Sequence, residues 1–329
     1  MANLTTGGTY VFNETAQKIV SRAYRLMGAI ESGESPASDM MSDALDVLNA
    51  MIKGWQASGI HVWCEEECIL FLQTSQIQYQ IGYGASDHAC LFQDFTQSYL
   101  TATAASGATS LLVASATGFT AGGYVGIQLD AGTNYWTTIS GISGTTITLA
   151  AGLPSQATSG AYVLTYLTPL MRPLRVPFGR TYLYSSQITT QMLRLARFDY
   201  DILPNDYNTG VPTQYFYDPQ QGNGAYTYAL GLMNVWPGPV DNTRAMRFVA
   251  QRPLQDITSV SSLPDFPAEW LSALAWNLAV ELAPEFGVPS DRMQVLVGGA
   301  GKWFDMAKKW DREPESVQFG WASQPFYRV

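Results

Sequence analysis

Two histidines and three cysteines lie close together in the first third of the sequence: His61, Cys64, Cys68, His88 and Cys90. Imidazole and thiolate are ligands that zinc prefers, and the interval between Cys64 and Cys68 is allowed for a zinc site. The other intervals match no standard zinc motif, and free cysteines often serve as small buried hydrophobic residues. We therefore expect no metal and no other cofactor. An odd number of cysteines also gives no disulfide framework, so we expect reduced thiols.

Two further stretches contain residue types that enzymes use. Glu65 to Glu67 offers three carboxylates, but consecutive residues of a strand point to alternate sides, so we expect a solvated acidic face. Gly298 to Lys302 resembles half of a phosphate loop, yet Trp303 follows where such a loop has Ser or Thr. The sequence has no serine-nucleophile elbow and no metalloprotease helix motif. We expect a protein that is not an enzyme; a cell-wall hydrolase, which needs a carboxylic acid of raised pKa in a cleft, stays open.

Composition limits the class of protein. Hydrophobic residues make up 47% of the 329 residues and charged residues only 14%, and the net charge is −9. Soluble proteins usually have about 25% charged residues, so we expect a surface that is neutral and polar or covered by partners. No apolar run has the ~20 residues of a membrane helix, and the first residues lack the pattern of a signal peptide. We expect synthesis in a cytoplasm and no membrane partner.

Helical periodicity marks both ends of the chain. Apolar residues at helical spacing predict one helix over residues 13–32, with Gly33 just past its end, and a second from Ser38 to Gly59. Near the C-terminus, the pattern predicts a helix from Pro267 up to Pro284 and another over Met293 to Trp310. The first two are expected to form a hairpin whose apolar stripes pack together and on the rest of the domain.

The middle of the chain has a different composition. Between Asp94 and Arg172, Asp130 is the only acidic or basic residue apart from the tyrosines. Glycines separate β-rich runs there, which predicts a small all-β domain inserted over residues 95–171. Low charge makes binding to nucleic-acid phosphates improbable for this insertion. Contact with other subunits or fibres, glycan binding and simple padding all stay open. The expected strands are 109–113, 124–129, 136–142, 145–150 and 162–167.

Downstream of the insertion, three strand-like runs predict a small antiparallel sheet with aromatic packing: 213–217, 230–235 and 246–250. The expected fold class is therefore α+β. A helical core, made of the N-terminal hairpin and the two C-terminal helices, is expected to accompany this small sheet and the inserted all-β domain.

An ordered series of short motifs resembles one protein family, the head-to-tail adaptor (connector) proteins of short-tailed bacteriophages, also called tail tubular protein A or packaged-DNA-stabilising proteins. Each motif is short, so the resemblance depends on their order. It covers residues 12–82 and 172–311. The motifs after the N-terminal helix pair are Tyr79 to Gly82, Arg172 to Val176, Asp201 to Pro204, Gly210 to Pro212 with Tyr215 to Tyr217, Val235 to Pro237, Arg252 to Leu254, and Leu263 to Trp270.

The resemblance implies a structural protein of the virion tail or neck. Residues 1–94 and 172–312 would form the adaptor core, 95–171 the insertion and 313–329 a C-terminal extension. A ring of twelve copies would dock under the portal protein, extend the DNA channel and carry the tail nozzle or tail fibre proteins. Genomic DNA would pass through without specific binding, because an acidic or neutral wall offers no lysine-rich surface for phosphates.

The C-terminal extension contains four aromatic residues outside any helical pattern, Phe319, Trp321, Phe326 and Tyr327. Such residues on a terminal segment favour contact with a partner surface, and the resemblance points to the portal. The alternative is a fibre-type or receptor-binding virion protein whose β-domain contacts the host surface.

Overall fold

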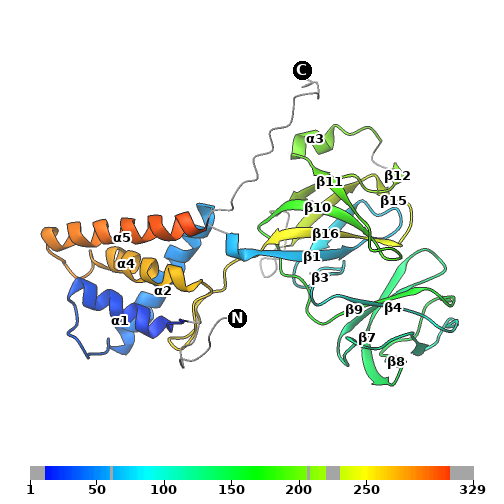
Figure 1. Ribbon diagram of the computed structural model, residues 1–329, viewed down its shortest axis with the longest axis horizontal. Helices are drawn as coiled ribbons and strands as arrows, with labels where there is room; N and C mark the ends of the chain where they lie inside the picture. The colour runs from blue at the N-terminus through cyan, green and yellow to red at the C-terminus, as the bar shows by residue number, and fades with distance from the viewer. Residues whose placement is uncertain (1–11, 60–61, 206–207, 220–229, 312–329) are drawn as a thin grey trace, which may run out of the picture. The chain divides into compact units, whose positions relative to one another are not determined.

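The computed structural model describes residues 12–59, 62–205, 208–219 and 230–311 (Figure 1). The chain forms two compact units. Residues 1–63 and 254–329 make up the first, which we call the helical unit, and residues 64–253 make up the second, the strand unit.

One buried helix organises the helical unit. Helix α4 (Leu271–Leu282) packs against α1 (Ala16–Met27), α2 (Ser38–Ala57) and α5 (Ser290–Trp310). The buried residues of α4 are all leucine or alanine, and three other helices cover them. A 3₁₀ turn, η2 (Ala268–Trp270), leads into it.

The four expected helices are present, but the first is shorter than expected. Helix α1 ends at Met27, and Gly28 follows it with a left-handed φ of 78°. A glycine in this conformation lets the backbone N–H groups of a helix end turn back onto the last turn. The expected end at Gly33 is wrong because a glycine five residues earlier already supplies this cap.

The strand unit is built on an eight-stranded sheet with the strand order β2-β14-β13-β11-β10-β16-β1-β3. All pairs are antiparallel except β11 with β13. The strands are β1 (Glu65–Phe71), β2 (Gln78–Ile81), β3 (Ala89–Leu91), β10 (Arg175–Leu183), β11 (Thr189–Arg194), β13 (Gln214–Asp218), β14 (Gly231–Trp236) and β16 (Arg244–Gln251).

A second sheet of six antiparallel strands lies within residues 96–166, in the order β4-β9-β6-β7-β8-β5. Five of its strands match the five expected runs to within about two residues, and β4 was not expected. The strands are β4 (Thr96–Tyr99), β5 (Ser110–Leu112), β6 (Tyr124–Gln128), β7 (Asn134–Ser143), β8 (Thr146–Leu149) and β9 (Tyr162–Tyr166).

Two small elements lie in the strand unit, and a third leads into it from the helical unit. A two-stranded parallel sheet pairs β12 (Thr209–Gly210) with β15 (Gly238–Pro239). A short helix, α3 (Arg197–Asp201), follows β11, and a 3₁₀ turn, η1 (Val62–Cys64), precedes β1.

The expected fold class, an α+β protein with a helical core and a small sheet, is wrong. Among the described residues 31% are in strands and 26% in helices, and the largest assembly is the eight-stranded sheet. The expected runs 213–217, 230–235 and 246–250 became β13, β14 and β16. Strands β1, β10 and β11, which join this sheet into one piece, were missed.

The two longest missed strands, β1 and β10, lack the usual alternation of apolar and polar residues. The second half of β1 is buried on both faces, so Cys68 to Phe71 is continuously apolar. In β10, Pro177 and Gly179 have the composition of a turn. The pairing of β10 with β16 shifts register between Arg175 and Phe178, and this irregularity accommodates the proline inside a strand.

Candidate functional site

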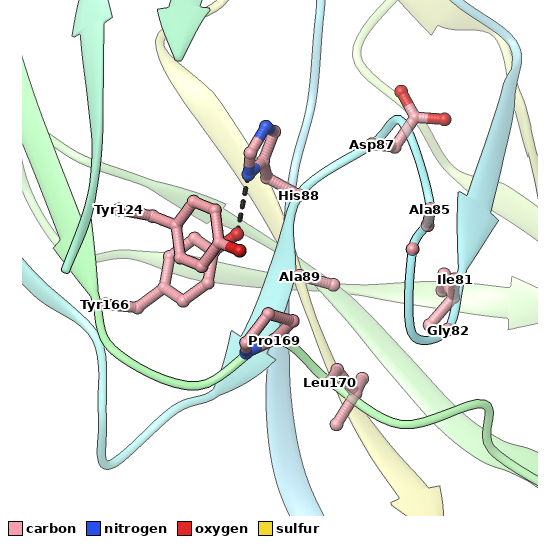
Figure 2. Close-up of a pocket in the computed structure, with 11 residues that line it drawn as sticks. Ile81, Gly82, Ala85, Asp87, His88, Ala89, Tyr124, Tyr166, Pro169 and Leu170 are labelled. Atoms are coloured by element: carbon pink, nitrogen blue, oxygen red, sulfur yellow. Dashed lines mark hydrogen bonds between the residues drawn. The ribbon is translucent and has the colours of Figure 1, made fainter. Parts of the chain in front are cut away.

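A small pocket of about 70 Å³ lies in the strand unit, beside the starts of β3 and β6 and the end of β9. His88 precedes β3, while Tyr124 and Tyr166 come from the six-stranded sheet. Figure 2 shows their side chains gathered on one side of the pocket, with Pro169 and Leu170 below them. The pocket therefore lies where the two large sheets of this unit meet.

The polar centre of the pocket is a hydrogen bond between His88 Nδ1 and the Tyr166 hydroxyl, 2.6 Å apart (Figure 2). The imidazole stacks on Trp136, with ring centroids 4.1 Å apart and planes 13° from parallel. Tyr124 meets it edge-on at 5.8 Å. Aromatic side chains thus fix the ring plane while the tyrosine hydroxyl fixes one nitrogen.

Burial removes charge from this pair. It lowers the pKa of His88 to about 4 and raises that of Tyr166 well above its usual value, because desolvation disfavours the charged form of each group. The nearby Asp87 carboxylate points away (Figure 2) and accepts hydrogen bonds from the Gln76 side chain at 2.7 Å and the Gln80 backbone at 2.8 Å. At neutral pH the pair is therefore a hydrogen bond between two neutral groups, which joins the segment before β3 to the end of β9.

We predict that His88 makes the strand unit sensitive to acid. An unfolded histidine has a pKa near 6.5, so between pH 6.5 and 4 the unfolded chain binds a proton that the folded chain does not. Its contribution to stability is complete above pH 6.5 and is lost as the pH falls toward 4. From pH 7 to pH 5 this loss is about 2 kcal/mol. Urea unfolding of wild type and His88→Gln at both pH values measures it.

The His88→Gln variant is the control for this effect, because glutamine does not titrate. We expect His88→Gln to be less stable at pH 7 but to lose about 2 kcal/mol less than wild type on going to pH 5. An equal loss in both proteins would show that other groups cause the acid sensitivity.

The cysteines are spread over two sides of the sheet. Cys68 belongs to the core cluster with Leu70 and Phe248, whereas Cys90 belongs to the aromatic cluster with Phe71 and Tyr166. Burial raises the pKa of both thiols, so both stay protonated and serve as hydrophobic side chains. His61 lies outside the described residues. Within the described ranges, no group of three potential metal ligands comes together.

The expectation of a solvated acidic face at Glu65 to Glu67 is wrong, because all three residues are half-buried. Glu66 is half-buried and accepts a hydrogen bond from Arg252 Nε at 2.9 Å. Glu67 is also half-buried and pairs with both Arg180 and Arg247. Arg247 comes from β16, Arg252 directly follows β16, and Arg180 comes from β10, so the local sequence around the glutamates cannot reveal these partners.

The stretch from Gly298 to Lys302 lies inside helix α5. Its backbone is helical, so its N–H groups are not arranged to cradle a phosphate. Gly299 has a packing reason: a Cβ atom there would lie 2.3 Å from the ring of Trp276 on α4. Gly298 is open, because a Cβ atom there would have no neighbour within 4 Å.

We predict opposite effects for alanine at these two glycines. Gly299→Ala pushes a methyl group into the Trp276 ring, and such overpacking costs about 1–3 kcal/mol. Gly298→Ala stabilises the helical unit by up to about 1 kcal/mol, because alanine favours a helix and no neighbour opposes it. Melting temperatures of the two variants test this. A Gly299→Ala protein as stable as Gly298→Ala would refute the close packing of α4 and α5.

The predicted portal-contact residues, Phe319, Trp321, Phe326 and Tyr327, lie outside the described residues. Sequence reasoning, in turn, missed the pair of His88 and Tyr166. These two residues are 78 positions apart, and neither forms part of a local motif. Tyr166 lies inside the expected insertion and His88 lies before it, so no local signal connected the two residues.

In the described part of the chain, no helix has the length and hydropathy needed to cross a membrane.

No protein-family model matches the sequence. No curated protein matches it either.

Proposed function

We propose that this chain is a structural virion protein, a head-to-tail adaptor that docks under a portal ring, extends the DNA channel and provides the attachment platform for the tail. One structural observation supports the proposal in addition to the order of the motifs in the sequence. Motifs that are far apart in the chain are direct neighbours in the strand unit, although each alone is short enough to occur by chance.

Three of these motifs lie on adjacent strands. Tyr79 to Gly82 includes the end of β2, Val235 to Pro237 includes the end of β14, and Tyr215 to Tyr217 lies within β13. Strand β14 pairs with β2 on one side and with β13 on the other. These three motifs therefore belong to one packed part of the strand unit.

A fourth motif joins the same assembly through side chains. The Tyr217 hydroxyl donates to the Pro173 carbonyl at 2.6 Å, and the Tyr215 hydroxyl donates to the Val176 carbonyl at 3.3 Å. Arg172 donates to the Pro219 carbonyl. The segment that follows the six-stranded sheet is therefore held by the tyrosines of β13.

The observed fold changes which part of the chain we assign to the adaptor role. We place the attachment platform on the strand unit, which contains the eight-stranded sheet, instead of on a helical core. Cyclic assembly of identical copies requires two different contact surfaces on each subunit, and two separate compact units can supply them. The net charge of −9 favours a channel through which duplex DNA slides, because binding to DNA depends on lysine and arginine at the phosphates.

We predict that removing residues 313–329 abolishes portal attachment while the fold is retained. Four aromatic side chains are lost with this segment, and the aromatic anchors of an interface commonly supply most of its binding energy. Co-sedimentation with portal rings measures attachment, and the melting temperature checks the fold. Attachment by the truncated protein at wild-type level would exclude the segment as the portal contact.

A further inference from the structure

Two arginines face each other on neighbouring strands of the eight-stranded sheet. Arg180 on β10 is the direct register partner of Arg247 on β16. Gln191 on β11 lies on the other side of Arg180, and Ile69 on β1 lies on the other side of Arg247. Residues opposite each other in adjacent strands share one face of a sheet, and like charges placed this way destabilise it. The pairing of Arg180 with Arg247 therefore brings two positive charges together on one face of the sheet.

One carboxylate faces this pair. Glu67 lies two residues before Ile69 on β1, so it is diagonal to Arg247 on the same face. Its two oxygens accept one hydrogen bond each, from Arg180 Nη2 and from Arg247 Nη2. These bonds hold the pKa of Glu67 below its ordinary value, so it is ionised at neutral pH. Two guanidinium groups and one carboxylate leave one positive charge without a partner among the described residues.

The arginines also retain donor capacity. A guanidinium has five N–H donors, and each of these arginines uses one on Glu67. The Nε atoms of both residues are buried without an acceptor in the described structure. Phe92 covers one face of the Arg247 guanidinium at 3.6 Å, so that arginine is held in a fixed plane. The side chains remain 28% and 21% exposed, which leaves access from solvent.

We propose that Arg180 and Arg247 form a binding site for one oxyanion, a carboxylate, sulfate or phosphate group, with Glu67 as the internal competitor for the same donors. Guanidinium groups bind such anions with paired, charge-assisted hydrogen bonds. This site does not depend on the proposed adaptor role. A purely structural Arg–Glu–Arg network would instead be complete without any further anion.

The test is a comparison of anion binding between wild type and single variants of the full-length protein. Sodium sulfate and sodium acetate are each titrated against sodium chloride at equal ionic strength, and the melting temperature of the strand unit is followed. We expect an extra rise in sulfate or acetate for wild type that is absent in Arg180→Gln. Arg175→Gln, an exposed arginine of the same strand, is the matched control and should behave like wild type.

Glu67→Gln separates a binding site from a structural network. Removing the competing carboxylate frees both arginines, so we expect sulfate to bind about tenfold more tightly and to restore stability lost by the substitution. A larger rise in melting temperature with acetate identifies a planar carboxylate as the preferred anion. A larger rise with sulfate identifies a tetrahedral anion. An equal anion response in wild type and Arg180→Gln would overturn the proposal, whether or not Glu67→Gln folds.

Discussion

Replacing Trp270 by alanine is expected to unfold the helical unit while the strand unit keeps its fold. The Trp270 side chain is fully buried, and its ring packs against Trp63 at 5.0 Å and Trp55 at 5.7 Å. Phe266 and Phe304 complete the cluster. Truncating a buried tryptophan costs about 3–5 kcal/mol, a large fraction of the ~5–15 kcal/mol that stabilises a typical domain. The indole N–H has no described acceptor, so no hydrogen bond is lost with the ring.

Hydrogen exchange read by region measures this effect. Amides of helices α1, α2, α4 and α5 should lose protection in Trp270→Ala, whereas those of the eight-stranded sheet should not, because the strand unit has core clusters of its own. Trp310→Ala is the matched control, since that tryptophan is 53% exposed on the same unit. Equal effects of the two substitutions would contradict the described aromatic core.

The second large effect is expected for Phe71→Ala. Phe71 ends strand β1, is 2% exposed and lies under side chains of the six-stranded sheet. Its ring centroid is 4.8 Å from that of Trp136 and 5.8 Å from that of Tyr166. We expect a cost of about 3–5 kcal/mol, as for other phenylalanines in cores. Because the ring packs on both sheets of the strand unit, the loss should lower the stability of the two sheets together.

Denaturant unfolding followed by regional hydrogen exchange tests this coupling. In Phe71→Ala, protection should fall in β6, β7 and β9 as well as in β1 and β16. Phe198→Ala provides the control within the same unit, since Phe198 is 72% exposed. Loss of protection in the eight-stranded sheet alone would mean that the six-stranded sheet is stabilised independently of Phe71.

The elements that could be predicted from the sequence are those with a local cause. Helix α4 follows from its leucine spacing, and β5 to β9 follow from glycine-separated runs in a segment almost without charge. The eight-stranded sheet could not be assembled in this way. Its strand β1 is apolar on both faces over Cys68 to Phe71 because two different clusters cover it, and β10 contains a proline that only its register shift explains.

The two sites, the His88–Tyr166 pair and the cluster of Glu67 with its arginines, depend even more on contacts between residues that are far apart in the sequence. The neutral bond between His88 and Tyr166 joins residues 78 positions apart. Glu67 meets Arg180 and Arg247 only after three strands have paired. Local sequence describes Glu65 to Glu67 as an acidic run, but it has no information about the arginines that neutralise part of it.

The adaptor role is tested most directly by mixing the full-length protein with assembled portal rings of the same virion. Native mass spectrometry gives the mass of any complex, and negative-stain imaging gives its symmetry. The account predicts a ring of this chain on the portal, with the copy number of the portal. Failure to associate with the portal, together with binding to fibres or host envelope glycans, would contradict it and favour a receptor-binding virion protein.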